Sequence, residues 1–191
     1  MASKEDIISL PHPDLRQTSA RIHVITDQTL KLINDMTTAA LDWEDSRPHE
    51  VAVALAAVQI DRLERIIIVR ADFDDKENRE FTVLINPVVT KKEGTPTYEH
   101  EGCLSVRDIY GNVPRYPRIR VKALDASGNE VRIKADGFIS RVLQHEIDHT
   151  NGLLFIDHID EDKNAFFTLT QEGDLEPLDY DIVASRGIFR N

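Results

Sequence analysis

The pattern His145-Glu146-Ile147-Asp148-His149 contains the residue types needed for metal-dependent hydrolysis. On an α-helix, residues four apart lie about one turn from each other, so His145 and His149 could bind one metal ion from the same face. Glu146 would be rotated by about 100° from His145, close enough to accept a proton from a metal-bound water without binding the ion itself. The pattern therefore predicts two ligands and a general base, and it requires a third ligand from elsewhere in the chain.

The segment around this pattern has the composition of a buried helix. Gly137 precedes it and Asn151-Gly152 follows it, and glycine is favoured at the left-handed position after a helix end. The spacing predicts a helix from about Phe138 to Thr150. Apolar residues fall on nearly every side of this helix, which is typical of a helix inside the protein: Phe138, Ile139, Val142, Leu143 and Ile147. Its polar side chains would then need partners in the interior.

Two residues are candidates for the third ligand. Cys103 is the only cysteine, so it cannot form an internal disulfide, and nothing in the cysteine content indicates an oxidising compartment. A lone cysteine of an intracellular protein is a small buried apolar residue, a nucleophile or a metal ligand. His158 is the alternative, because zinc endopeptidases with an H-E-x-x-H pattern usually take their third ligand, His or Glu, from downstream.

The composition predicts a soluble globular protein with one main domain. The chain has 191 residues, of which 41% are hydrophobic and 30% are charged, and its formal net charge is −11. This charge argues against nucleic-acid binding and against adhesion to anionic membranes, so we expect neither partner. The N-terminus has no signal-peptide pattern, and no apolar run is long enough to span a membrane, so a cytoplasmic location is expected.

The rest of the chain mixes helical and strand patterns. We expect a helix from about Asp27 to Leu41, with Leu30 and Ile33 on its apolar face and Thr26 or Asp27 as its cap. The expected strands are residues 66–69, 81–85 (ended by Asn86-Pro87), 118–123 and 131–133, the last two forming a hairpin. Residues 51–60 fit strand or helix equally, and residues 42–50 and 91–97 read as loops.

These elements predict an α+β fold in which mixed or antiparallel sheets pack around the central buried helix with the H-E-x-x-H pattern. Residues 1–160 would form a catalytic domain. Residues 161–191 would form an acidic C-terminal tail, with a short helix at about 165–169 and partial disorder beyond it.

Three segments together resemble the motifs of the peptide deformylases. Glu101-Gly102-Cys103-Leu104-Ser105 and residues 144–149 resemble the second and third family motifs, and residues 52–59 correspond in part to the first motif, G-x-G-L-A-A-x-Q. The motifs occur in the family order, and the resemblance spans roughly residues 5–160. Further landmarks of the family are Asn86-Pro87, Val113-Pro114-Arg115 and Phe155-Ile156-Asp157.

The resemblance implies a catalytic metal site. Its ligands would be Cys103, His145 and His149, with water in the fourth position, and three protein ligands plus an open position are typical of catalytic sites. A thiolate and two imidazoles suit Fe(II), Zn(II), Ni(II) or Co(II) without selecting among them. The family implies Fe(II) as the physiological ion and Zn(II) as a less active substitute.

The implied reaction is hydrolysis of the N-formyl group from N-formylmethionine at the N-terminus of newly made proteins, releasing formate. Glu146 would take a proton from the attacking water and pass it to the departing amine. The resemblance places the Gln59 side-chain amide and the Leu104 backbone N–H beside the developing oxyanion. It also suggests an ion pair between Arg115 and Asp148 that braces the helix.

The substrate would be N-formylmethionyl peptides, or nascent chains, bound in extended form along Val53, Ala54 and Gly102. Phe138 and Val142 lie on successive turns of the same helix face as His145 and could line a pocket for the methionine side chain. In bacterial deformylases a basic C-terminal helix can dock on the ribosome. The acidic tail of this chain gives little support for that contact, although a transient association would not depend on it.

Three positions depart from the family pattern: Ala52 and Ala54 replace glycines, and Val58 replaces a proline. If either alanine position required a positive φ, the substitution would be strained, whereas in extended backbone the methyl groups would only narrow the substrate groove. The departures keep open a metal-dependent amidase of the same fold with an altered N-acyl substrate. The zinc endopeptidase and a metal-free binding module are further alternatives.

Overall fold

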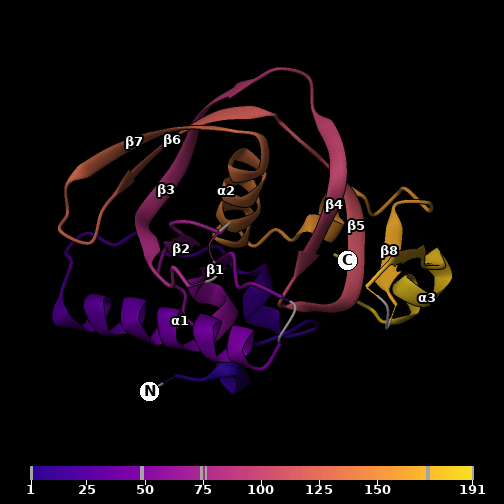
Figure 1. The fold of residues 1–191 in the computed structure, drawn as a ribbon, viewed down its shortest axis with the longest axis horizontal. Helices are drawn as coiled ribbons and strands as arrows, with labels where there is room; N and C mark the ends of the chain where they lie inside the picture. Colours follow the sequence, from indigo (N-terminus) through magenta and orange to yellow (C-terminus); the bar gives the residue numbers. More distant parts are fainter. Residues whose placement is uncertain (1, 48–49, 74, 76, 171–172, 191) are drawn as a thin grey trace.

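The computed structural model describes residues 2–47, 50–73, 75, 77–170 and 173–190. Two antiparallel sheets lie on either side of a central helix, α2, as Figure 1 shows. The strand order is β1-β2-β3-β6-β7 in the first sheet and β4-β5-β8-β9 in the second. The predicted α+β class is confirmed. None of the helices in the described ranges is long and apolar enough to cross a membrane.

The first sheet forms because its strands carry the apolar patterns expected of half-buried or fully buried strands. β2 is a β-branched run whose residues are all buried, whereas β6 and β7 alternate between inward apolar and outward charged residues. The predicted hairpin is confirmed as β6 and β7. The bounds are Ala54–Ala56 for β1, Ile66–Arg70 for β2, Phe81–Glu93 for β3, Arg118–Leu124 for β6 and Glu130–Asp136 for β7.

Helix α2 (Gly137–His149) packs against the inner face of this sheet. Its apolar side chains Val142, Leu143 and Ile147 join a buried cluster with inward residues of β2, β3, β6 and β7. The predicted interior helix is therefore present, with the H-E-x-x-H pattern in its last two turns. Leu143 and Ile147 are fixed by this packing, and the polar residues that lie between them on the helix therefore have little freedom to move.

The second sheet presents Cys103 to α2. Strand β4 ends at Cys103, which pairs with Val106 of β5, so only Leu104 and Ser105 form the turn between them. This tight hairpin fixes the position of the cysteine at a sheet edge next to the helix. The bounds are Thr97–Cys103 for β4, Val106–Arg115 for β5, Phe166–Leu169 for β8 and Leu175–Pro177 for β9.

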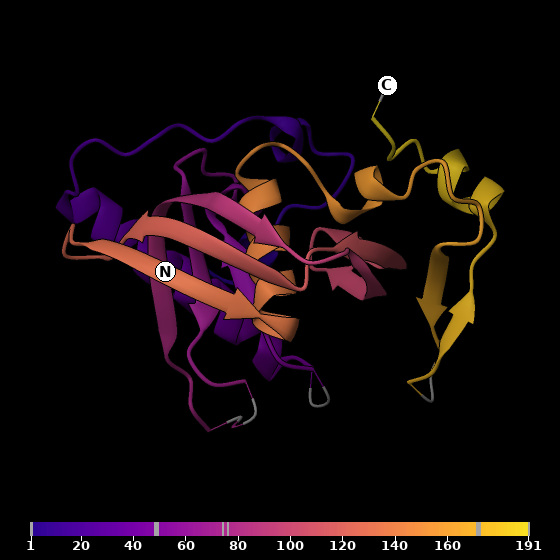
Figure 2. The same ribbon diagram turned by 90° about the horizontal axis from the view of Figure 1, so that it is seen from above.

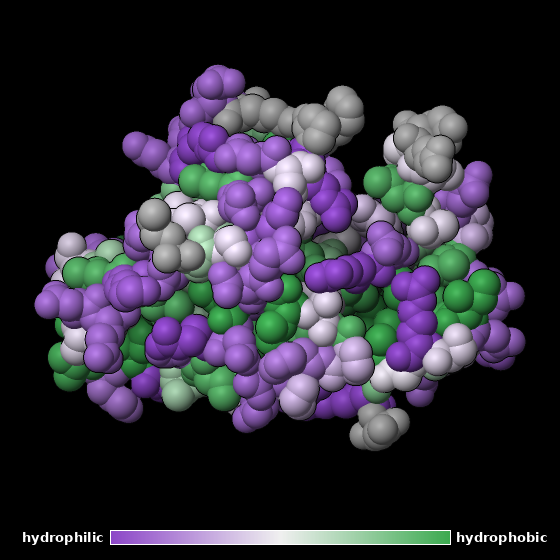
Figure 3. Space-filling model, turned by 90° about the horizontal axis from the view of Figure 1, so that it is seen from below, coloured by the Kyte–Doolittle hydropathy of each residue, from purple (hydrophilic) through white to green (hydrophobic). Residues whose placement is uncertain are grey.

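Helix α1 (Asp27–Asp45) covers the other side of the first sheet (Figures 1 and 2). Thr26 caps it as predicted, but the helix continues to Asp45, into the expected loop. The predicted apolar residues Ile33, Met36 and Ala40 do face the core, whereas Leu30 is 46% exposed and was assigned wrongly. Seen from below, the surface is mostly hydrophilic with hydrophobic side chains between (Figure 3). The shorter helices are η1 (Lys4–Asp6), η2 (Pro13–Arg16), η3 (Ala57–Ile60), η4 (Phe155–His158) and α3 (Tyr180–Ser185).

The predicted end of a strand at Asn86-Pro87 is wrong, because β3 continues through both residues. Its register with β6 shifts between Ile85 and Val88, which is a bulge that accommodates a proline without an N–H. Asn86 has a φ of 52°, and its side chain is bonded to the backbone N–H and C=O of Ile22 (2.9 and 2.7 Å). These tertiary bonds stabilise a backbone conformation that the local sequence disfavours.

The short helix predicted at residues 165–169 is also wrong, because Phe166–Leu169 forms β8. Phe166 and Phe167 pair with Gly111 and Tyr110 of β5, and aromatic residues pack well on a sheet. The described part of the tail is folded rather than disordered. Val183 of α3, like Ile188 after it, is buried in the same cluster as Leu15 and Phe155. A division at residue 160 stays a prediction.

Gly152 ends the segment after α2 with a φ of +71°, in the left-handed region expected from the sequence. A Cβ atom at this position would lie 2.5 Å from the backbone oxygen of Arg16. Gly187 has a similar φ of +63°, but a Cβ there would meet nothing within 4 Å. The two glycines therefore share the backbone requirement and differ in the space around them.

We expect Gly152→Ala to lower the melting temperature much more than Gly187→Ala. A left-handed alanine costs about 1–2 kcal/mol in both variants, and only Gly152→Ala adds a clash with backbone. Thermal unfolding followed by circular dichroism measures the difference. Equal shifts in the two variants would contradict the close approach between Gly152 and Arg16.

Candidate metal centre

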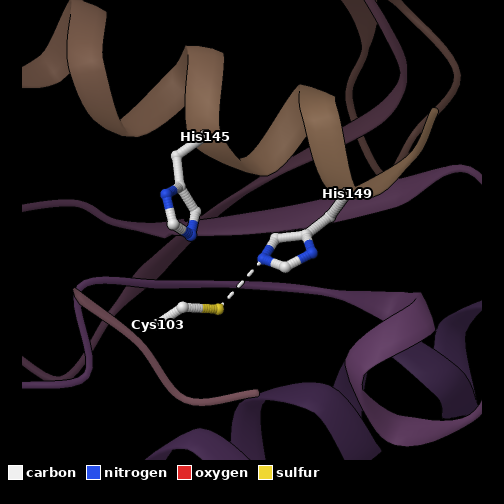
Figure 4. Close-up of side chains that lie close together, drawn as sticks. All are labelled: Cys103, His145 and His149. Atoms are coloured by element: carbon white, nitrogen blue, oxygen red, sulfur yellow. Dashed lines mark hydrogen bonds between the residues drawn. The ribbon is translucent and has the colours of Figure 1, made fainter. Parts of the chain in front are cut away.

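Three side chains that could bind a metal ion converge between α2 and the end of β4. His145 and His149 project from successive turns of α2 toward Cys103, as Figure 4 shows. The Cys103 Sγ lies 3.3 Å from the His149 Nε2, and one ligand atom from each of the three residues lies within 4.8 Å of the others. The structure thus brings together the three residues predicted as ligands.

The geometry of these atoms fits one divalent ion. A tetrahedral site with metal–sulfur and metal–nitrogen distances of about 2.3 and 2.0–2.1 Å requires sulfur and nitrogen to lie about 3.6 Å apart. The observed 3.3 Å between Cys103 and His149 is within a few tenths of an ångström of that value. One thiolate and two imidazoles suit Fe(II), Zn(II), Ni(II) or Co(II), and three ligands leave a coordination position open.

Glu101 organises the surroundings of these residues. It lies on β4, two residues before Cys103, and its carboxylate accepts four hydrogen bonds from three residues on two other elements, β5 and α2. Arg115 donates to both oxygens (2.9 and 3.0 Å), Arg141 donates to Oε1 (2.8 Å), and His145 Nδ1–H donates to Oε2 (2.9 Å). The bond to Nδ1 leaves Nε2 of His145 for a metal ion, so Glu101 orients this ligand.

The charges around His145 favour a cation at the centre. Burial alone would lower the pKa of His145, but hydrogen bonds and charges of Cys103 and Glu101 raise it well above its usual value. Burial would raise the pKa of Glu101, and the bonds from His145 and Arg115 instead lower it strongly. Burial and the neighbouring His145 lower the pKa of His149. The Glu101 carboxylate thus places a negative charge next to His145, which is consistent with a metal site.

The predicted contact between Arg115 and Asp148 is present as an ion pair. Asp148 also accepts a hydrogen bond from His158 Nε2 (2.7 Å), so His158 belongs to this ion-pair cluster and lies outside the three-donor group. Burial would raise the pKa of Asp148, and His158 and Arg115 lower it. Arg115 therefore links Glu101 to Asp148 and bridges the β4–β5 hairpin to the last turn of α2.

Glu146 is buried beside the three donors and has the properties of a proton acceptor. Its side chain lines the same cavity as His145, and among the described residues none hydrogen-bonds its Oε2. Burial raises the pKa of Glu146 to about 7, against the lowering effect of the His145 charge. A carboxylate whose pKa lies near neutrality is well matched to proton transfer.

Gln59 reaches the centre from η3. Its Oε1 accepts a hydrogen bond from the Ala56 N–H (2.8 Å), which turns its amide nitrogen toward Cys103 Sγ (3.6 Å) and Ser105 Oγ (3.2 Å). The side-chain amide thus presents N–H groups at the metal centre. Leu104 lies in the β4–β5 turn and lines the same cavity.

A cavity of about 670 Å³ opens over these groups. It lies between β1 and β4, and among the described residues each of these strands pairs with one other strand, so both have an edge without a strand partner there. The described residues that line it include all five predicted to contact substrate: Val53, Ala54, Gly102, Phe138 and Val142. Neither Ala52 nor Ala54 has a positive φ, so these departures from the family glycines leave the backbone unstrained.

Two residues of the site were missed from the sequence. Arg141 is buried on α2 and donates to Glu101, to the Val113 carbonyl and to the Thr97 carbonyl (2.8, 2.8 and 2.9 Å). Arg141 lies among apolar residues of the predicted buried helix, four residues before His145, and a buried arginine needs partners. This position was the sequence signal that could have identified it. Tyr110 lies against Gly102, where a Cβ would be 2.6 Å from its ring, and no pattern pointed to that contact.

Comparisons with known proteins agree with this geometry. The family model for polypeptide deformylase matches residues 4–165. The peptide deformylase of Brachyspira hyodysenteriae is 44% identical over 149 residues (76% of this chain and 75% of the relative). That of Thermomicrobium roseum is 42% identical over 158 residues (81% and 85%).

Solved structures show the same fold. A peptide deformylase from Synechococcus elongatus in complex with actinonin superposes with a TM-score of 0.72 at 32% identity, covering 80% of this chain and 78% of the other. One from Legionella pneumophila gives 0.70 at 36% identity, covering 83% and 86%. The family model, these identities and the coverage together show that the chain belongs to the peptide deformylase family.

Proposed function

We propose that this protein hydrolyses the N-formyl group from N-formylmethionine at the N-terminus of newly made polypeptides and releases formate. The observation that carries the proposal is the position of Glu146, a buried carboxylate that lines one cavity with Cys103 and His145, two members of the three-donor group that His149 completes. Membership of the peptide deformylase family supports the same reaction. A zinc endopeptidase with His158 as third ligand is disfavoured, because His158 is bonded to Asp148 instead.

In the proposed mechanism each residue near the centre has a separate task. Cys103, His145 and His149 would hold the metal ion, which when bound would supply Lewis-acid activation of the attacking water. Glu146 accepts the proton of the attacking water and donates it to the amine that leaves. The Gln59 amide, held by the Ala56 N–H, and the Leu104 backbone N–H donate to the oxyanion.

The peptide would bind in extended form between the unpaired edges of β1 and β4. Main-chain hydrogen bonds to these edges give affinity for many sequences, and a pocket for the first side chain gives selectivity. Phe138 and Val142 line the cavity beside His145 and offer an apolar wall for methionine. In the Synechococcus elongatus relative, actinonin was bound in the crystal, and we infer that this chain accepts ligands of that kind.

Ala52 and Ala54 favour a second candidate, an amidase with an altered N-acyl substrate. Ala54 lines the cavity, where its methyl group occupies space that a glycine would leave open. A narrower groove would change which peptides fit while leaving the metal centre untouched. The two candidates differ in substrate preference and share the chemistry.

We further infer Fe(II) as the physiological ion, with Zn(II), Ni(II) or Co(II) as substitutes, and a cytoplasmic location. The thiolate and imidazole donors support a transition metal of this group. The described tail is acidic. It contributes β8 and β9 to the second sheet, and its helix α3 contains no basic residue that would favour a ribosome contact.

Cys103→Ala should abolish stoichiometric metal binding, because it removes one of three ligands. His158→Ala is the matched control, since His158 lies near the centre and outside the donor group. Metal content after anaerobic purification, measured by atomic emission, tests the assignment. Retained metal in Cys103→Ala together with lost metal in His158→Ala would favour the endopeptidase ligand set.

Glu146→Ala should lower formate release by about 10²–10⁴-fold, the usual contribution of positioned acid–base catalysis. Its metal content and melting temperature should stay near those of the unmodified protein, because Glu146 is outside the ligand set. A formate-dehydrogenase-coupled assay with formyl-Met-Ala measures the loss. Activity within a few-fold of the unmodified protein would exclude Glu146 as the general base.

Formyl-Met-Ala should be turned over more efficiently than formyl-Val-Ala or acetyl-Met-Ala. The methionine side chain fills the apolar wall, and the formyl group fits where an acetyl methyl would crowd the centre. Comparing kcat/KM for the three peptides separates the two candidate functions. The absence of any preference for formyl-Met would favour the amidase with an altered substrate.

A further inference from the structure

The outer face of β3, β6 and β7 is rich in basic side chains. β6 alternates strictly, with Ile119, Val121 and Ala123 buried, and its intervening residues are exposed. The inner face packs on α2, and the outer face looks away from it. The basic residues of this outer face, called here the basic sheet face, are Lys91, Arg118, Arg120, Lys122, Arg132 and Lys134.

The strand register places like charges directly opposite one another. In one row Lys91 pairs with Arg120, and Arg120 pairs with Lys134, so all three positions across the sheet are basic. In the next row Lys122 pairs with Arg132. Like charges at opposed positions destabilise a sheet. Five bases thus occupy the two central rows, at a cost in stability that folding alone does not explain.

The acids of this face lie at its ends and are too few to neutralise it. Glu93 and Asp136 share the row of Arg118 at one end, and Glu130 lies at the other end. Glu93 pairs with both Lys91 and Arg120 (2.8 and 3.4 Å).

At the opposite end Glu130 is shared in the same way, by Lys122 and Arg132 (2.6 and 2.8 Å). Within the described part of the chain, Lys134 forms no ion pair. The side chains of Lys122 and Arg132 remain 51% and 79% exposed despite their shared acid. The face is therefore positive and accessible.

This distribution is unexpected in a chain with a formal net charge of −11. The overall charge led to the expectation of no nucleic-acid partner, and that expectation assumed evenly spread charge. Binding to a polyanion depends on the basic side chains within reach of it, because exposed charges farther apart than a Debye length of about 8 Å are largely screened. We propose that the basic sheet face binds the phosphate backbone of RNA.

Several features favour RNA over an anionic membrane. Arg118, Arg120 and Arg132 present planar guanidinium groups that match phosphate oxygens two at a time. The central rows contain one exposed apolar residue, Val88, so the face offers little for insertion between lipids. A strand of RNA would contact the narrow basic rows alone, whereas a flat membrane would also approach the acidic surroundings.

The distances between the basic side chains of this face suit contacts with the phosphates of a nucleic acid, without preference for its sequence. Strands lie about 4.8 Å apart, and outward residues along one strand are about 6.6 Å apart, so the five central bases cover a patch of roughly 10 by 7 Å. Such a patch would contact a few successive phosphates. We choose RNA rather than DNA because the proposed substrate is a newly made polypeptide, which emerges from an RNA-rich ribosome. This choice rests on the proposed function.

Binding of a fluorescein-labelled RNA hairpin, followed by fluorescence anisotropy between about 50 and 200 mM salt, tests the proposal. We expect micromolar to submillimolar affinity that weakens as salt rises. Arg132→Gln combined with Lys134→Gln should weaken binding by about fivefold for each lost phosphate contact near 0.1 M salt, and should make the salt dependence shallower.

The matched control is Lys31→Gln combined with Arg62→Gln, which removes the same charge from exposed side chains elsewhere (73% and 47%). It should leave RNA binding nearly unchanged. Equal weakening in both double variants would overturn the proposal, as would the absence of RNA binding by the unmodified protein. Binding to phosphatidylglycerol vesicles without binding to RNA would overturn it in favour of a membrane.

Formate release with formyl-Met-Ala should be the same in both double variants and the unmodified protein, because none of these side chains lies at the metal centre. This assay separates the two proposals. Loss of RNA binding with intact formate release supports the basic sheet face as a separate binding site. Absence of formate release in the unmodified protein would refute the proposed reaction. Any RNA binding that was measured would then have to serve a function other than the processing of nascent chains.

Discussion

The carboxylate of Glu101 is the interaction on which the metal centre depends. It joins β4 to β5 through Arg115 and to α2 through Arg141 and His145. A buried carboxylate is costly to desolvate, by several kcal/mol, and three hydrogen bonds from two arginines and one from His145 offset that cost. Because Glu101 lies on β4 and its partners lie on β5 and α2, the bonds can form only when the β4–β5 hairpin and α2 are correctly placed. The same bonds therefore stabilise the fold and orient the metal ligand.

The two histidine ligands on the last turns of α2 could be predicted from the sequence. The spacing of His145 and His149 is a local property of a helix, and the apolar residues around them predict burial directly. Cys103 lies far away in the chain, and its position was inferred from the resemblance to a family. Composition and periodicity alone do not distinguish Cys103 from His158 as the third metal ligand. The hydrogen bond between Asp148 and His158 distinguishes the two candidates in space, and no sequence pattern predicts it.

The errors share a physical cause, which is that long-range partners override local preference. Pro87 normally ends a strand, but a bulge and the bonds between Asn86 and Ile22 allow β3 to continue. The segment at 165–169 has no strong helical pattern, and pairing of Phe166 with Gly111 makes it a strand. Arg141 was missed for the same reason, because its partners Thr97 and Val113 become its neighbours only after the hairpin folds.

The distribution of charged residues also depends on the fold, and the net charge of the chain does not reveal it. The net charge of −11 is a property of composition, and it describes long-range repulsion of polyanions. The register of β3, β6 and β7 places five bases in two adjacent rows, and register depends on the bulges of β3 as well as on the hairpin turn. A shift by one residue would turn these side chains inward and bury them. The apolar inner face that packs on α2 therefore also determines that the basic residues lie together on the outside.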